Sequence, residues 1–361
     1  MKSLKLTSTR VWRTYKGGSN IDRFLGNAGA ADSHYPEDWI ASTVMAGSNE
    51  SRGDNNEGLS EVCGGGYLRD YIKKDPESML GVGHAKKYGA NMGVLVKLLD
   101  AGERLTVQVH PDNQTAKKFF NSDFGKTEAW HFLACRTLPG NAGGNELNST
   151  CESDSMGRAY IYLGFKKGIT KERWRRLFEL QDIDGMLDCL HKIPVAAGDT
   201  YIVKGGVPHA IGEGCFLAEI QEPTDYTIRM EKTSPSGLAV SDEQCHLGIG
   251  FDKMFECFNY DGLDFNQTVQ KYRLLSDGRS LINKEHTDKF SLSKLVVEGH
   301  QDIDLDGSFK ILIVTSGGGE LCEQEGTAPL KKGDRFFIPA CAEGVGLRGN
   351  MEVLVCKGPA V

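Results

Sequence analysis

The chain has 361 residues, of which 39% are hydrophobic and 25% are charged, and its formal net charge is −7. This composition is typical of a globular protein with about two domains, and it excludes the strongly basic footprint of a nucleic-acid-binding protein. We expect no signal peptide and no membrane span, because no run approaches the roughly 18 apolar residues that a span requires. The ten cysteines are dispersed and include no CxxC pair, which favours reduced thiols and a cytoplasmic location.

The 44 glycines cluster between short apolar runs, which predicts a β-rich fold with many tight turns. We expect strands over residues 11–15, 92–99, 105–110, 128–135, 160–165, 215–221, 226–230, 292–297 and 309–315, with 215–221 and 226–230 paired. Helices are expected over about 66–80, 113–121 and 170–191, and one further helix over 242–258. Residues 138–157 are rich in glycine and polar side chains and predict an exposed loop.

Two segments of the sequence resemble each other. Residues 197–203 (AGDTYIV) and 332–338 (KGDRFFI) each place a Gly-Asp turn before a strand that contains aromatic residues. This weak repeat predicts two copies of one small barrel. A composition shift near residues 234–237 suggests a domain boundary, with a first domain over 1–235 and a linking helix and second domain over 236–361. The second copy has no counterpart of His209, so we expect it to bind no metal.

Four polar side chains predict a metal site in the first domain. Gln108 and His110 share one face of the strand that opens the stretch 105–132. Glu128 lies on the next strand, and His209 ends the glycine-rich turn GGVPH. Two imidazoles, a carboxylate and an amide oxygen suit zinc or a similar divalent ion. Each residue alone has an ordinary explanation, such as a core histidine or a surface ion pair between Glu128 and Lys126. Together the four residues favour binding of one metal ion.

A second group of residues is basic. Lys126 is two positions from Glu128 on the same strand face, and Arg229 and Lys232 follow the segment AEIQEPTDYTIR. Guanidinium and ammonium groups suit a phosphate or an enediolate. The ordinary alternative for Arg229 is a surface ion pair with Glu231.

The motifs TVQVHPD, GKTEAWHFL, GGVPHAIG and AEIQEPTDYTIR resemble, in order, the successive motifs of type I phosphomannose isomerase in its short bacterial cupin form. VWRTYKGG and PEDWIASTV are also similar to that family. The resemblance implies a mainly β cupin fold (a double-stranded β-helix or jelly roll) with two barrel-like domains and a small helical insertion. It also implies one zinc ion per chain and assigns these site residues: Gln108, His110, Glu128 and His209 as ligands, Arg229 as catalytic, and Lys126 and Glu219 beside the substrate.

Two departures from the family pattern stand out. Thr127 occupies a position where the family often has proline, and the segment MEKTSPSG after Arg229 differs from the common bacterial version. Both lie close to predicted site residues.

The resemblance implies interconversion of mannose 6-phosphate and fructose 6-phosphate through an enediolate. Glu219 is the first candidate for the base, ahead of Lys126 and a metal-bound water, and Glu222 is a further acidic candidate. Lys126 or Lys232 is expected to hold the phosphate. The alternatives are a cupin isomerase for another phosphosugar such as glucose 6-phosphate, an iron dioxygenase, and a non-catalytic phosphosugar-binding protein. A phosphosugar is the only partner expected, with no nucleic acid or membrane, and the chain is expected to be a monomer or homodimer.

Overall fold

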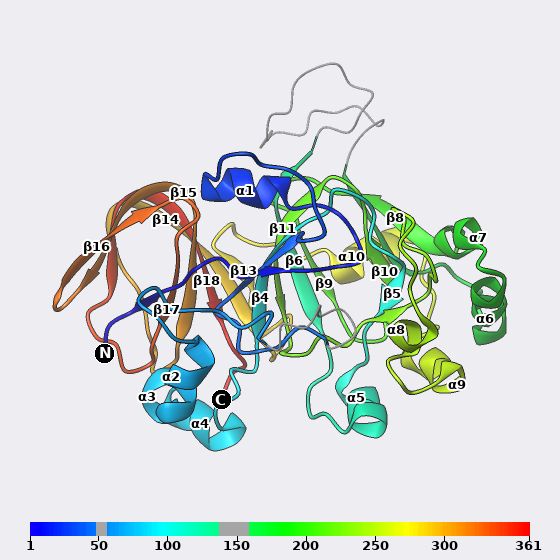
Figure 1. The fold of residues 1–361 in the computed structure, drawn as a ribbon, viewed down its shortest axis with the longest axis horizontal. Helices are drawn as coiled ribbons and strands as arrows, with labels where there is room; N and C mark the ends of the chain where they lie inside the picture. The colour runs from blue at the N-terminus through cyan, green and yellow to red at the C-terminus, as the bar shows by residue number, and fades with distance from the viewer. Residues whose placement is uncertain (48–55, 137–158) are drawn as a thin grey trace, which may run out of the picture.

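The computed structural model describes residues 1–47, 56–136 and 159–361 (Figure 1). The loop predicted over 138–157 lies outside these described residues. The fold is mainly β, as predicted, and its named strands form three antiparallel sheets that stay open rather than closing into barrels. Helices α2–α4 lie below the C-terminal strands at the lower left of the view, whereas α6, α7 and α9 lie at its right-hand end (Figure 1).

Two sheets build the part of the molecule that carries the predicted ligands. The six-stranded sheet has the order β2 (Arg10–Val11), β3 (Glu37–Ile40), β4 (Leu95–Asp100), β11 (Cys215–Gln221), β6 (Glu128–Cys135) and β9 (Thr200–Val203). The five-stranded sheet has the order β12 (Ile228–Arg229), β5 (Gln108–Val109), β10 (His209–Ile211), β7 (Tyr160–Phe165) and β8 (Leu190–Pro194). Strands that are neighbours in these sheets are mostly remote in sequence.

The third sheet contains the C-terminal strands. Its order is β1 (Leu4–Lys5), β17 (Arg335–Ile338), β15 (Lys310–Glu323), β18 (Gly346–Lys357), β14 (Ser291–Asp302) and β13 (Ser280–Ile282), and β16 (Gly326–Lys331) pairs with β15. The first strand of the chain therefore joins the last sheet, with Leu4 opposite Phe337. The predicted domain boundary at residue 235 stays a prediction.

The helices are short. They are α1 (Ser19–Leu25), α2 (Leu68–Lys74), α3 (Pro76–Leu80), α4 (Val82–Tyr88), α5 (Asn113–Phe120), α6 (Lys171–Leu180), α7 (Ile183–Asp188), α8 (Asp242–His246), α9 (Phe251–Met254), the 3-10 helix η1 (Phe255–Cys257) and α10 (Phe265–Tyr272). Asp112 and Thr170 cap α5 and α6, because their side chains accept the backbone N–H groups of Thr115 and Arg173. No helix in the described part of the chain is long and apolar enough to cross a membrane.

Several predicted elements differ in extent from the structure, and the strand predicted over 105–110 is limited to β5. The helix predicted over 242–258 breaks into α8, α9 and η1, because Leu247, Gly248 and Gly250 all have positive φ. The strand predicted over 11–15 ends at Val11. The segment 226–230 contributes only β12, which joins the five-stranded sheet instead of pairing with β11.

The two Gly-Asp turns adopt one structure. Gly198 and Gly333 have φ values of 90° and 89°, which glycine adopts without strain. The carboxylates of Asp199 and Asp334 each accept a bond from the backbone N–H three residues earlier, at 3.0 and 2.9 Å. The sequence repeat therefore reflects an equivalent turn at the start of β9 and of β17.

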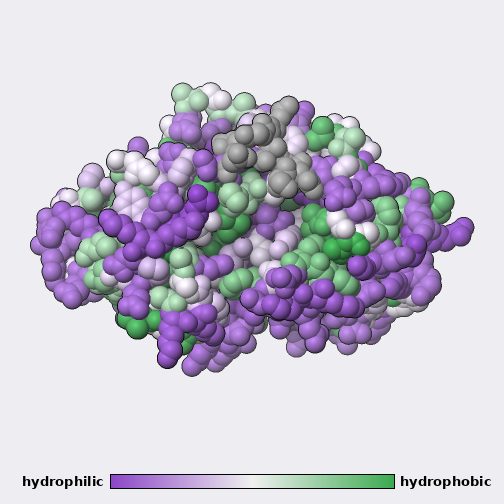
Figure 2. Space-filling model, turned by 60° about the horizontal axis from the view of Figure 1, so that its bottom comes forward, coloured by the Kyte–Doolittle hydropathy of each residue, from purple (hydrophilic) through white to green (hydrophobic). Residues whose placement is uncertain are grey.

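One hydrophobic core joins the six-stranded sheet to the C-terminal sheet. Ile40, Leu98 and Ile220 on one side belong to the same buried cluster as Phe309 and Phe337 on the other. The outer face drawn in Figure 2 is largely hydrophilic, and its hydrophobic residues form small groups between hydrophilic ones. The C-terminal sheet thus covers one face of the six-stranded sheet and leaves its other face for the site.

A buried ion pair between Asp38 of β3 and Arg335 of β17 also crosses this junction. We expect Arg335→Met to lower the free energy of unfolding by about 3–5 kcal/mol, because it leaves the wholly buried Asp38 carboxylate without its cation. Urea denaturation followed by tryptophan fluorescence measures the change. The matched control is Arg348→Met, which removes an exposed ion pair with Glu320 in the same sheet and should cost about 1 kcal/mol or less. Equal effects of the two substitutions would contradict the prediction.

Candidate functional site

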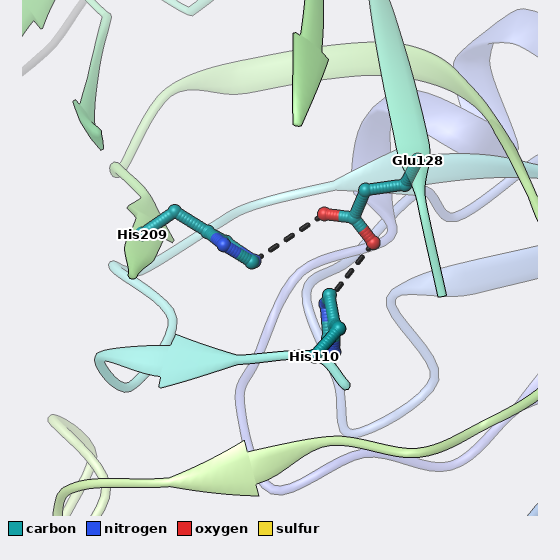
Figure 3. A group of neighbouring side chains, drawn as sticks. All are labelled: His110, Glu128 and His209. Carbon is teal, nitrogen blue, oxygen red and sulfur yellow. Dashed lines mark ion pairs between the residues drawn. The ribbon is translucent and has the colours of Figure 1, made fainter. Parts of the chain in front are cut away.

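His110, Glu128 and His209 converge between the two facing sheets (Figure 3). One ligand atom from each lies within 4.8 Å of the others, and all three residues are buried. Nε2 of His110 is 3.1 Å from Oε2 of Glu128, and Nε2 of His209 is 3.3 Å from Oε1 of the same carboxylate. Among the residues that the structure describes, this is the single cluster of His, Cys, Asp or Glu with such geometry.

Strand pairing explains how remote residues reach this cluster. In the five-stranded sheet, Gln108 lies between His209 of β10 and Arg229 of β12 in one cross-strand row. The Gln108 amide nitrogen is 3.2 Å from Nε2 of His209. Because an amide can turn by 180° in the same space, its oxygen can occupy that position and act as a fourth ligand.

Backbone carbonyls fix the tautomers of both histidines. Nδ1 of His110 is 2.7 Å from the Tyr226 carbonyl, and Nδ1 of His209 is 2.9 Å from the Val207 carbonyl. A carbonyl only accepts hydrogen bonds, so each Nδ1 carries the hydrogen and each neutral ring presents the Nε2 lone pair to Glu128. Burial and the nearby Lys126 ammonium hold the pKa of His110 well below its usual range, and burial also lowers the pKa of His209.

The donor set fits a divalent cation. The Glu128 atom Oε2 receives no hydrogen bond from any described residue, although it is buried. The Lys126 ammonium lies 3.3 Å from that oxygen and 3.1 Å from Nε2 of His110, so one positive charge already faces these acceptors. Two imidazole nitrogens, a carboxylate and an amide oxygen are a ligand set that zinc and similar ions accept.

A pocket adjoins the cluster, with Gln108 and Lys126 in its lining. Its lining is rich in charge and includes all three residues predicted to act on the substrate, Lys126, Glu219 and Arg229. The other charged or amide residues in the lining are Arg13, Glu37, Lys97, Gln108 and Asp225. The pocket therefore combines several buried cations with several buried carboxylates, as expected for a site that binds an anionic polar molecule.

Lys97 is a pocket residue that the sequence analysis missed. Its ammonium lies 3.4 Å from Glu37 and 3.3 Å from Glu219. Burial opposes protonation of Lys97, but these two carboxylates outweigh burial and raise its pKa. The sequence feature that pointed to Lys97 is its position as the single charged residue in the apolar strand MGVLVKLL. Such a strand is expected to be buried on both faces, so the charge would have no access to solvent.

Glu219 occupies the centre of the six-stranded sheet, beside the predicted ligand Glu128. Trp130 donates its indole N–H to both carboxylates, at 3.1 Å to Glu128 and 3.2 Å to Glu219. Burial and the neighbouring charge of Glu128 raise the pKa of Glu219. A carboxylate with a raised pKa is a stronger base than an exposed one.

Arg13, Glu37 and Asp225 form a second group that the sequence analysis missed. Nε of Arg13 is 3.0 Å from Glu37, and Nη2 of Arg13 is 3.3 Å from Asp225. Burial opposes ionisation of Glu37, but Arg13 and Lys97 outweigh burial and hold its pKa far below the usual range. Each of the three lies in a motif that resembles the family, and a charge at a buried position of such a motif was the available signal.

Arg229 lies in the pocket lining and is buried, so the alternative of a surface ion pair is wrong. Its Nη1 donates to the carbonyls of Thr227 and Gln244, at 3.1 and 3.2 Å. The expected alternative partner, Glu231, instead binds Arg104 at 2.6 Å.

Two further candidates lie outside the pocket lining. Lys232 is partly exposed and pairs with Asp242 at 2.8 Å, so it does not reach the pocket. Glu222 is buried, and its carboxylate is taken up by hydrogen bonds to Asn113 and Thr127. The structure brings neither Lys232 nor Glu222 into contact with the ligand cluster.

Two protein-family models match this chain. The model described as phosphomannose isomerase type I, catalytic domain, matches residues 8–128. The model described as mannose-6-phosphate isomerase, cupin domain, matches residues 282–357. The two matches together span more than half of the chain.

Curated relatives agree with these matches. The chain is 27% identical over 269 residues to the mannose-6-phosphate isomerase ManA of Bacillus subtilis, covering 74% of this chain and 75% of that protein. It is 26% identical over 301 residues to the mannose-6-phosphate isomerase of Streptococcus mutans, covering 82% of this chain and 84% of that protein.

Solved structures show the same fold. The crystal structure of the mannose 6-phosphate isomerase from Bacillus subtilis superposes with a TM-score of 0.72 at 22% identity, covering 99% of both chains. The apo form of the enzyme from Salmonella typhimurium superposes with a TM-score of 0.71 at 16% identity, covering 100% of both chains. These likenesses, with the match to a cupin domain, confirm the predicted cupin fold.

Proposed function

Because this chain belongs to the type I phosphomannose isomerase family, we propose that it is a zinc-dependent isomerase that interconverts mannose 6-phosphate and fructose 6-phosphate. The observation that carries the proposal is the buried cluster of His110, Glu128 and His209 beside a charged pocket. We assign these three residues and Gln108 as the ligands of one zinc ion per chain. The zinc ion, the monomeric or homodimeric state and the cytoplasmic location stay predictions.

The proposed reaction moves a proton between neighbouring carbons of the open-chain sugar through an enediolate. Its physical difficulty is negative charge that develops on the sugar oxygens, and a bound divalent ion supplies Lewis-acid stabilisation of that charge. Arg229 lies in the same cross-strand row as Gln108, so its guanidinium can donate charge-assisted hydrogen bonds to the same oxygens. These bonds strengthen as charge develops, which lowers the barrier rather than merely tightening binding.

We assign Glu219 as the base that removes and returns the proton. It lines the pocket, and burial beside the Glu128 charge raises its pKa, which increases its basicity. Lys126 is the second candidate. Its ammonium contacts both His110 and Glu128, which supports a role near the cluster rather than at a remote phosphate. Lys232 pairs with Asp242 and does not line the pocket, so we assign it no phosphate contact.

Metal removal tests the proposed function. We expect chelator-treated protein to lose turnover of mannose 6-phosphate in a coupled assay, because the chelator removes the ion that would stabilise the developing negative charge. Added zinc should restore turnover. Glucose 6-phosphate is the parallel substrate, and it should turn over far more slowly. Undiminished turnover after complete metal removal would contradict the zinc assignment. Tight phosphosugar binding without turnover in zinc-loaded protein would instead favour a non-catalytic role.

A further inference from the structure

A buried carboxylate outside the pocket joins two chain segments that carry ligands. We propose that Glu222 is a positioning residue for the divalent-cation site, and that it holds His110 and Glu128 at ligand distance through Asn113 and Thr127. The inference rests on the proposed function only in requiring that the cluster binds a divalent cation.

Each oxygen of the Glu222 carboxylate is bonded to a different ligand-bearing segment. Oε2 accepts the backbone N–H of Thr127 at 2.9 Å, and Thr127 immediately precedes Glu128. Oε1 accepts the side-chain amide of Asn113 at 2.9 Å, and Asn113 begins α5 three residues after His110. Glu222 is only 1% exposed, so water does not compete for these bonds. One side chain therefore fixes the distance between the two segments.

Neighbouring bonds hold the same peptide from its other side. The backbone N–H of Glu222 donates to the carbonyl of Thr127 at 3.0 Å, so residue 222 binds both ends of residue 127. The hydroxyl of Thr224 donates to the carbonyl of Gly125 at 2.6 Å. A displacement of Glu128 would break a charge-assisted hydrogen bond in a buried place, where such a loss is expensive.

Both carboxylate oxygens of Glu222 must accept hydrogen bonds to hold the two segments together. A glutamine at position 222 offers one acceptor oxygen and one donor NH₂ group. It would therefore lose one of the two hydrogen bonds, because its NH₂ group would meet the donor of either Thr127 or Asn113. The hydrogen bond from the backbone of residue 127 also depends on the residue type, because a proline at that position would have no N–H to donate. The Lys289 ammonium is 3.8 Å from Oε1 of Glu222 and partly exposed, so the two N–H donors are the close partners of the carboxylate.

The zinc dissociation constant of Glu222→Gln, measured by competition with a chromogenic chelator, tests the inference. We expect binding about 10–100-fold weaker than in the unsubstituted protein, the usual effect of removing an outer partner of a metal ligand. The matched control is Glu256→Gln. Glu256 is an exposed carboxylate of η1. It pairs at 2.8 Å with Lys118 of α5, the helix that contains Asn113, and it makes no bond to Thr127. It should leave the zinc dissociation constant unchanged.

The outcomes separate positioning from stability. A purely structural role would lower the melting temperature of the metal-free protein and leave zinc affinity unchanged, and unchanged affinity overturns the inference whatever the stability. If Glu222→Gln does not fold, Asn113→Ala removes one donor, keeps the carboxylate, and should still weaken zinc binding by a smaller factor; an unchanged constant there overturns the inference too. An unsubstituted protein that binds no divalent cation would overturn both this inference and the proposed function.

Discussion

Arg229→Ala is expected to lower kcat by about 10²–10³-fold, the usual effect of removing one donor that faces developing negative charge. The guanidinium lines the pocket, is buried, and lies in the same cross-strand row as the ligand Gln108. The described hydrogen bonds and ion pairs of His110, Glu128 and His209 are made with other residues than Arg229. Zinc content should therefore stay close to one ion per chain. A coupled isomerase assay and metal analysis of the same preparation measure both quantities.

Arg229→Lys separates charge from geometry. Lysine keeps the positive charge but loses the planar fork that can bind two oxygens at once. We expect its kcat to lie between those of the unsubstituted protein and the alanine variant. A turnover near normal in Arg229→Ala would remove Arg229 from the catalytic assignment, whatever the motif around it resembles.

Glu128→Gln is expected to have the second large effect, on zinc affinity itself. Glu128 supplies the only negative charge in the ligand set, and its carboxylate faces both His110 and His209. Zinc binding should weaken by more than the roughly 10–100-fold that loss of an outer partner causes, and isomerase activity should vanish at limiting zinc. Metal content after dialysis and a titration of activity with zinc measure the two effects.

Glu219→Gln is the matched comparison for Glu128→Gln. Glu219 is also buried and accepts the same indole N–H of Trp130, yet it is assigned as the base and not as a ligand. Its glutamine variant should therefore lose turnover and retain zinc. Retained zinc in the Glu128 variant would remove that residue from the ligand set, and lost zinc in the Glu219 variant would join the two carboxylates in one metal site.

Local patterns in the sequence were enough for several features. The alternation of a strand put Gln108 and His110 on one face, and the spacing of Lys126 and Glu128 put those two on another. Asp112 and Thr170 have side chains that accept N-cap hydrogen bonds, and each caps the helix that follows it. Each of these depends on chain geometry within a few residues, which a single sequence reports directly.

The charged lining of the pocket was not accessible in the same way. Lys97 looks like an isolated charge in an apolar segment, and Arg13 is one of several basic residues near the start of the chain. Nothing nearby in sequence shows that Glu37, Glu219 and Asp225 pair with them. These pairs form only when segments from four distant parts of the chain lie side by side. Burial of a charge is stable only beside its partner, and the partner is a property of the packing.

The sequence by itself determined the mainly β character, the two Gly-Asp turns, and the residue types that can bind a divalent ion beside an anionic sugar. Tertiary structure alone decided that Arg229 enters the pocket while Lys232 turns to Asp242, and that Glu222 links two ligand-bearing segments instead of reaching the substrate. The physical reason is range. Side-chain alternation, caps and turns arise from neighbours along the chain, whereas the hydrogen-bond partner of a buried polar group is chosen by segments that meet only in the folded protein.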